Sequence, residues 1–135
     1  MVLIASLLMN PFQAQADEGP CAIPWRVAYY QQGRTAPLRK LVRCAERHWD
    51  APGGARKALS VVACESGFRP DAYNPAGLGY GGLMQHSLRY WPARAENLLP
   101  KRWDISRSWR SARANIIVGI KIAHSQGWGP WAGCA

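Results

Sequence analysis

Four cysteines limit what this chain can fold into more than any other feature, because each disulfide would hold two distant segments together. They are Cys21, Cys44, Cys64 and Cys134, and no two of them form the CxxC spacing typical of structural zinc sites. Disulfides are therefore the better explanation, with three possible pairings, and each would add about 3 to 5 kcal/mol to the stability. Such bridges are typical of small extracellular domains.

The N-terminal residues agree with export from the cell. The segment "MVLIASLLMNPFQAQA" has an apolar run from Val2 to Met9, followed by the small-x-small pattern Ala14-Gln15-Ala16. Residues 1–16 are therefore predicted to be a signal peptide, although no Lys or Arg precedes the apolar run; a short buried helix is the alternative. No stretch of the sequence is long enough to span a bilayer. We expect a protein that is secreted, extracellular or associated with a cell wall.

The chain is strongly basic, with 17 Lys and Arg against 8 Asp and Glu and a formal net charge of +9. A charge of this size favours anionic polymers, which include nucleic acid, acidic lipid surfaces and the phosphate and carboxylate groups of a bacterial wall. Because an exported protein meets little nucleic acid, wall glycans and anionic wall polymers are the expected partners. A chain of 135 residues suits one compact domain, and we expect a monomer.

Two amphipathic helices are predicted in the first half of the chain. Residues 37–49 and 55–66 place apolar side chains at spacings of three and four, and Gly67 suits the C-terminal end of the second helix. From residue 68 to residue 82 the chain is rich in Pro, Gly, Asn and Asp, which predicts a loop or a short β-hairpin.

Two more helical segments are predicted in the second half. Residues 86–91 are expected to form one or two helical turns closed by Pro92. Ser111 is a candidate N-cap and Gly127 a candidate C-cap of a helix that we expect to be central and buried. The fold class is therefore mainly α (α+β), with a small β-hairpin or loop element.

Glu65, in the segment "ACESGF", is the candidate catalytic acid. It falls in the last turn of a predicted helix, where unpaired carbonyl groups and apolar neighbours raise the pKa of a carboxyl group, as general acid catalysis near neutral pH requires. The alternative is a solvated glutamate, which is common at helix ends. The segment after it supplies polar groups suited to a sugar, on Asn74, Tyr80 and Gln85. Seven tryptophans add apolar faces, most of them expected in the core.

Several ordered motifs resemble known wall-cleaving enzymes. "ESGFRPDAYNPAGLGYGGLMQ" and "ANIIVGIKIA" resemble motifs of lytic transglycosylases with the lysozyme-like (SLT-type) fold. "CESG", "YGGL", "SLRYW" and "QGWGPWAGC" are more closely similar to the resuscitation-promoting factor domain of actinobacteria. The matches cover about residues 55–135. Ile122 stands where the transglycosylase motif often carries a tyrosine.

The resemblance implies a lysozyme-like catalytic domain at residues 55–135. Residues 17–54 match none of these motifs, and we expect them to form a helical extension packed on that domain. Glu65 would be the single general acid and base, without a cofactor or a metal. The resemblance also implies a disulfide between Cys64 and Cys134, and with it one between Cys21 and Cys44. The residues expected to bind substrate are Ser66, Asn74, Tyr80, Gln85, Trp91 and Asn115.

The implied reaction cleaves the β-1,4 bond between N-acetylmuramic acid and N-acetylglucosamine in peptidoglycan and leaves a 1,6-anhydro product. Glycoside hydrolysis normally uses two carboxylates, about 5 to 9.5 Å apart. None of the other acids has a motif that names it as a partner of Glu65, which fits an enzyme with one carboxylate. The alternatives are a hydrolytic muramidase with Asp71 as the second carboxylate, and a non-catalytic module that binds the wall or nucleic acid.

Overall fold

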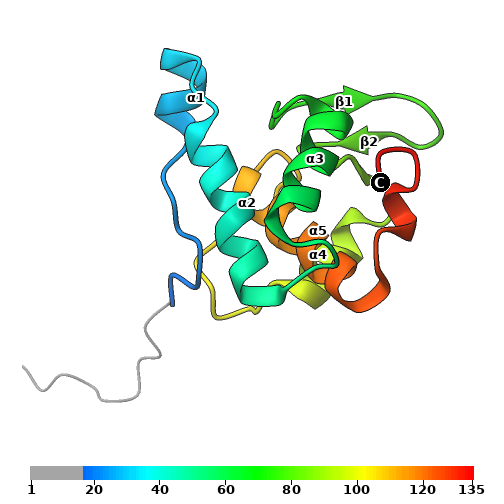
Figure 1. Ribbon diagram of the computed structural model, residues 1–135. Coiled ribbons are helices and arrows are strands. Elements are labelled where there is room, and N and C mark those ends of the chain that lie inside the picture. The colour runs from blue at the N-terminus through cyan, green and yellow to red at the C-terminus, as the bar shows by residue number, and fades with distance from the viewer. Residues whose placement is uncertain (1–16) are drawn as a thin grey trace, which may run out of the picture.

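The computed structural model describes residues 17–135, so the predicted signal peptide lies outside the described residues. The predicted fold class is confirmed, because the described residues form mainly helices and one small antiparallel sheet, which lies beside α3 (Figure 1). None of the helices in residues 17–135 combines the length and the apolar character needed to cross a membrane. The elements are α1 (Arg26–Gln32), α2 (Ala36–Trp49), α3 (Gly54–Ser66), β1 (Tyr73–Asn74), β2 (Tyr80–Gly81), β3 (His86–Ser87), α4 (Trp91–Leu98), α5 (Ala112–Gln126) and the short 3-10 helix η1 (Gly129–Trp131).

Helix α5 is the centre of the core, as the sequence predicts. Eleven of its 15 residues are buried, and α2 and α4 pack against it (Figure 1). The predicted cap at its start is present, because the Ser111 hydroxyl accepts a hydrogen bond from the Ala114 amide at 3.3 Å. Gly127 follows the last helical residue. The buried helix therefore supplies a fixed base for the segments that surround it.

Helices α2 and α3 lie side by side and begin within one residue of the predicted starts. Leu38, Leu41, Val42 and Ala45 face the core from α2 at helical spacing. Gly67 ends α3 with φ of 60°, a left-handed conformation that glycine adopts without strain. The end of α3, where Glu65 lies, is therefore set by the sequence itself.

The predicted hairpin is a three-stranded antiparallel sheet in the order β1-β2-β3. Asn74 lies opposite Tyr80, and Gly81 lies opposite both Tyr73 and His86. A Cβ at Gly81 would approach the Trp109 ring to 2.5 Å. Glycine is therefore needed at this point, because the indole lies directly against the backbone.

The predicted helix at residues 86–91 is wrong. His86–Ser87 pairs with β2 as strand β3, and α4 begins only at Trp91. Pro92 lies in the first turn of α4, where a missing amide hydrogen costs nothing, so proline opens this helix instead of closing an earlier one. Helix α1 was not predicted. It buries none of its residues and therefore carries no apolar periodicity.

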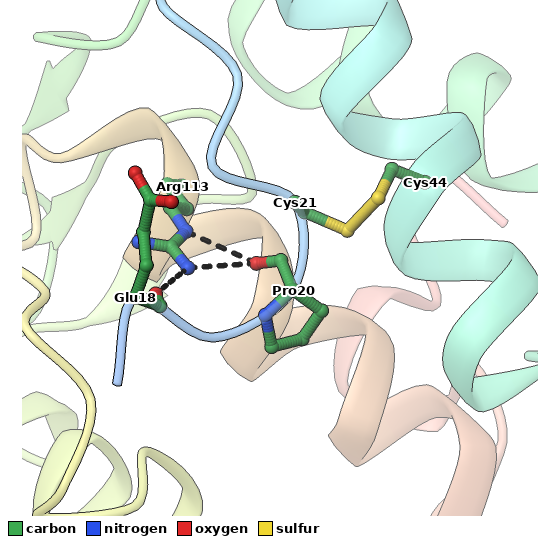
Figure 2. The surroundings of a disulfide bond; sticks show 5 residues. All are labelled: Glu18, Pro20, Cys21, Cys44 and Arg113. Atoms are coloured by element: carbon green, nitrogen blue, oxygen red, sulfur yellow. Dashed lines mark hydrogen bonds between the residues drawn. A yellow bond between two sulfur atoms is a disulfide. The ribbon is translucent and has the colours of Figure 1, made fainter.

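Residues 17–21 cross the start of α5 and are held there by two kinds of contact (Figure 2). The Arg113 guanidinium donates to the Pro20 carbonyl from Nε at 3.2 Å and from Nη2 at 2.8 Å, and Nη2 also donates to the Glu18 carbonyl. The next residue, Cys21, forms a disulfide with Cys44 on α2. These contacts tie the segment before α1 to α2 and α5.

Removing the Cys21–Cys44 disulfide should lower the free energy of unfolding by about 3 kcal/mol, because the bridge closes a loop of 23 residues in the unfolded chain. The change is Cys21→Ala with Cys44→Ala, measured by urea unfolding followed by circular dichroism. A loss below about 1 kcal/mol would show that the Arg113 contacts alone hold the segment.

Candidate active site

The partly exposed Glu65, the next-to-last residue of α3, lines a cavity of about 210 Å³. The cavity is built from the end of α3, the sheet and the C-terminal segment. Four residues that the sequence singled out, Glu65 among them, meet here. The lining residues are Glu65, Asn74, Tyr80, Gln85, Pro130 and Trp131.

Two features of the sheet direct its polar residues toward the cavity: the register of β1 on β2, and the turn that leads into β3. Asn74 and Tyr80 are directly opposite across β1 and β2, so their side chains share one face of the sheet. Gln85 has φ of 49°, in the left-handed region. Its Nε2 donates to the carbonyls of Ala72 and Gly82, each at 3.0 Å. These bonds fix the side-chain amide and leave its carbonyl oxygen free to accept from a ligand.

The Glu65 carboxyl group favours its neutral form. Burial raises the pKa of Glu65 above its ordinary value of 4.5, and no charged group of residues 17–135 contributes to the shift. The position of Glu65 in the sequence predicts this direction. A carboxyl group of this kind holds its proton closer to neutral pH, as a general acid must.

A disulfide next to Glu65 brings the C-terminal segment to the cavity. Cys64 pairs with Cys134, and Cys21 pairs with Cys44, which is the pairing implied by the resemblance. The segment before Cys134 carries Trp131, whose Nε1 donates to the Met84 carbonyl at 2.7 Å. One wall of the cavity is thereby joined both to the end of α3 and to the turn after β2.

Asn115, which the sequence predicts to bind substrate, is a buried residue that is not part of the cavity lining. Its side chain is fully buried, with no exposed surface. Its Oδ1 accepts from the Met84 amide at 2.8 Å, and its Nδ2 donates to the carbonyls of Gly81 at 3.2 Å and Trp109 at 3.0 Å. Asn115 therefore positions the turn between β2 and β3 and cannot touch a ligand in the cavity.

Ser66 and Trp91 were also predicted to bind substrate, and the structure places both in the core. The buried Ser66 hydroxyl donates to the Val62 carbonyl, four residues earlier in α3, at 3.2 Å. The Trp91 indole donates to the Arg107 carbonyl at 2.9 Å. Sequence reasoning missed Pro130 and Trp131 as cavity residues, although "GWGPWAGC" was one of the motifs that carried the resemblance.

Glu65 is the only carboxylate among the described residues that line the cavity. Asp71, the candidate second carboxylate, is exposed in the loop between α3 and β1. Its charge acts on α1, where it adds to the effect of burial in raising the pKa of Tyr29. Glu46 is buried in α2, and burial raises its pKa, although the backbone amide of Ala51 acts in the opposite direction.

One group of potential metal ligands occurs in the part of the chain that the structure describes, formed by Cys21, Cys44 and His48. Both sulfur atoms belong to a disulfide, so neither is the thiolate that a metal would need. The cavity at Glu65 offers a single carboxylate with amide, phenol and indole groups. This set suits hydrogen bonding to a neutral polar ligand such as a sugar.

His86 is a buried neutral ring that contacts the cavity residue Trp131. Arg94 Nη1 lies 3.1 Å from His86 Nδ1, and because arginine can only donate, the proton of the imidazole must be on Nε2. Nε2 then donates to the backbone carbonyl of Asn115 at 3.0 Å. The ring also packs edge-on against Trp131, with centroids 5.9 Å apart. Burial lowers the pKa of His86 to about 3.

Comparisons of the chain with protein-family models, with curated proteins and with solved structures found no match.

Acid should destabilise the protein through His86. The unfolded histidine binds a proton below about pH 6.5 whereas the folded one does so only near pH 3, so stability falls as pH decreases between these values. The slope from this group is up to about 1.4 kcal/mol per pH unit. Urea unfolding at several pH values should show this loss of stability in the unmodified protein and in His48→Gln. The contribution should be absent in His86→Gln.

A direct check is the imidazole NMR titration of the unmodified protein. At pH 5 the ring of His86 should still show the chemical shifts of a neutral imidazole. A ring that titrates near pH 6.5 would contradict the buried neutral state.

Proposed function

We propose that the protein is a peptidoglycan lytic transglycosylase that cleaves the β-1,4 bond between N-acetylmuramic acid and N-acetylglucosamine. The observation that carries the proposal is the single, partly buried carboxyl group of Glu65 in a cavity walled by sugar-compatible side chains. The ordered motifs from residue 65 to the C-terminus support the same function.

The first step needs a proton donor, and Glu65 is suited to supply it. In its neutral form Glu65 donates its proton to the glycosidic oxygen, and the bond from that oxygen to C1 of the muramic sugar breaks. The leaving sugar departs with a free hydroxyl group. Burial of Glu65, which raises its pKa, keeps a larger fraction of the enzyme in this proton-bearing form.

The second step needs a base, and Glu65 is now ionised. It removes the proton from the 6-hydroxyl of the same muramic sugar, and O6 forms a bond to C1. The product is a 1,6-anhydro ring, no water is consumed, and Glu65 ends the cycle protonated as it began. The absence of another carboxylate among the described residues of the cavity supports this route over one that must activate water.

The other cavity residues have roles in binding. The Asn74 amide and the free carbonyl oxygen of Gln85 can hydrogen-bond the hydroxyl and N-acetyl groups of a sugar. Tyr80 keeps 39% of its surface exposed, so its ring can pack against the apolar face of a pyranose. Trp131 is buried and forms part of the cavity wall.

Glu65→Gln should reduce the cleavage of purified peptidoglycan at least about 10³-fold, because the same group serves both proton transfers. Asp71→Asn is the matched control, since it removes a nearby carboxylate that does not line the cavity, and it should keep the rate of the unmodified enzyme. Mass spectrometry of the released muropeptides should show 1,6-anhydro ends.

Other results would assign other functions. Reducing ends, together with a large loss of rate in Asp71→Asn, would identify a hydrolytic muramidase. Wall binding by Glu65→Gln and the unmodified protein alike, with no release of muropeptides by either, would identify a non-catalytic binding module.

A further inference from the structure

Helix α2 carries a row of cations on the side that faces away from the core. Its apolar residues pack inward, whereas four basic residues are all exposed on the opposite side. They fall within about 100° of arc on the helix, because successive residues are about 100° apart. We call this surface the α2 basic face, and it consists of Arg39, Lys40, Arg43 and Arg47.

The α2 basic face is not neutralised by the protein. Within residues 17–135 the one ion pair joins Arg102 to Asp17, far along the chain from α2. The acid of the helix itself, Glu46, is buried, and Asp50 at its C-cap forms no ion pair with the face. Cations three and four residues apart on a helix repel one another. The helix keeps this repulsion, which an anionic partner would relieve.

The spacing of the arginines suits a polymer with regularly placed phosphates. Arg39, Arg43 and Arg47 are four residues apart, so they rise about 6 Å at each step and span about 12 Å along the helix. Guanidinium groups form paired hydrogen bonds to phosphate oxygens, which ammonium groups do not. A linear phosphodiester chain laid along α2 would meet one arginine after another.

Nucleic acid fits the same surface poorly. Proteins that bind single strands combine cations with exposed aromatic rings on which the bases stack. The exposed residues of α2 include no Trp, Tyr or Phe. The two disulfides also indicate an oxidising compartment. A phosphodiester polymer without bases is therefore the better match.

We propose that the α2 basic face binds the phosphodiester polymers of a bacterial cell wall and holds the protein there. One end of the face contacts the segment that follows Glu65, because the Arg39 guanidinium lies 4.1 Å from the ring centroid of Phe68, three residues after Glu65. A polymer held on α2 would keep the cavity near glycan strands of the same wall. The location at a wall rests on the proposed function, whereas the binding itself needs no cleavage.

The test is a pelleting assay with insoluble purified walls that carry polyol-phosphate polymers, and with the same walls after hydrofluoric acid has removed those polymers. Lys40→Gln/Arg43→Gln/Arg47→Gln changes three residues whose side chains make no hydrogen bond or ion pair within residues 17–135. The matched control, Arg26→Gln/Arg89→Gln/Lys101→Gln, removes two Arg and one Lys from three other exposed places. Both variants take the formal charge from +9 to +6, because each removes three cations.

The α2 variant should bind untreated walls about tenfold more weakly than the unmodified protein at 0.15 M salt, and its affinity should depend less on salt. The control should lose less than about threefold. Stripped walls should bind all three proteins equally weakly.

Three results would overturn the proposal. Equal losses in both variants would mean that net charge alone drives binding. Undiminished binding to stripped walls would exclude the phosphodiester polymer. Tighter α2-dependent binding to duplex DNA, at equal phosphate concentration, would assign the face to nucleic acid.

Cleavage of short glycans that lack the polymer, assayed in parallel, should be unchanged in the α2 variant. A failure to cleave by any of the proteins would count against the proposed function and leave the binding result standing.

Discussion

One buried amide group, on Asn115, holds the candidate active site in place. Its oxygen and nitrogen bond to the backbone of Gly81, Met84 and Trp109, and the backbone carbonyl of Asn115 accepts from His86. A short sheet has few hydrogen bonds of its own and little stability by itself. Asn115 belongs to α5, the most buried helix. Its bonds therefore hold the turn between β2 and β3, next to the polar residues of the cavity, in a fixed position on the core. An unpaired polar group at this depth would be costly, so the network must form as a whole.

The second constraint is covalent and acts at Glu65 itself. The Cys64–Cys134 disulfide joins residues 70 positions apart and places the segment with Trp131 against the end of α3. Partial burial of Glu65 is the cause of its raised pKa, and this segment is one of the walls that bury it. The chemistry proposed for Glu65 therefore depends on a contact between the middle of the chain and its C-terminal segment.

The sequence was sufficient wherever the signal was local. Helical spacing and the caps Ser111 and Gly67 predicted helix ends to within one residue, and the motif after Glu65 predicted the residues that gather around it. It was insufficient where a residue suits two environments. Proline can follow one helix or open the next, so Pro92 was misread. A motif gives chain order but not the side to which a side chain points, so the sequence does not distinguish Asn115 as a core residue from a ligand-binding residue.

The central claim is that one carboxyl group suffices because the sugar supplies its own nucleophile. The most direct measurement is digestion of peptidoglycan in water enriched in the heavy isotope of oxygen, followed by mass spectrometry of the new glycan ends. If Glu65 works alone as proposed, C1 of the muramic sugar bonds to its own O6 and the released ends carry no heavy oxygen. Heavy oxygen at C1 of those ends would show that water attacked, and would contradict the account.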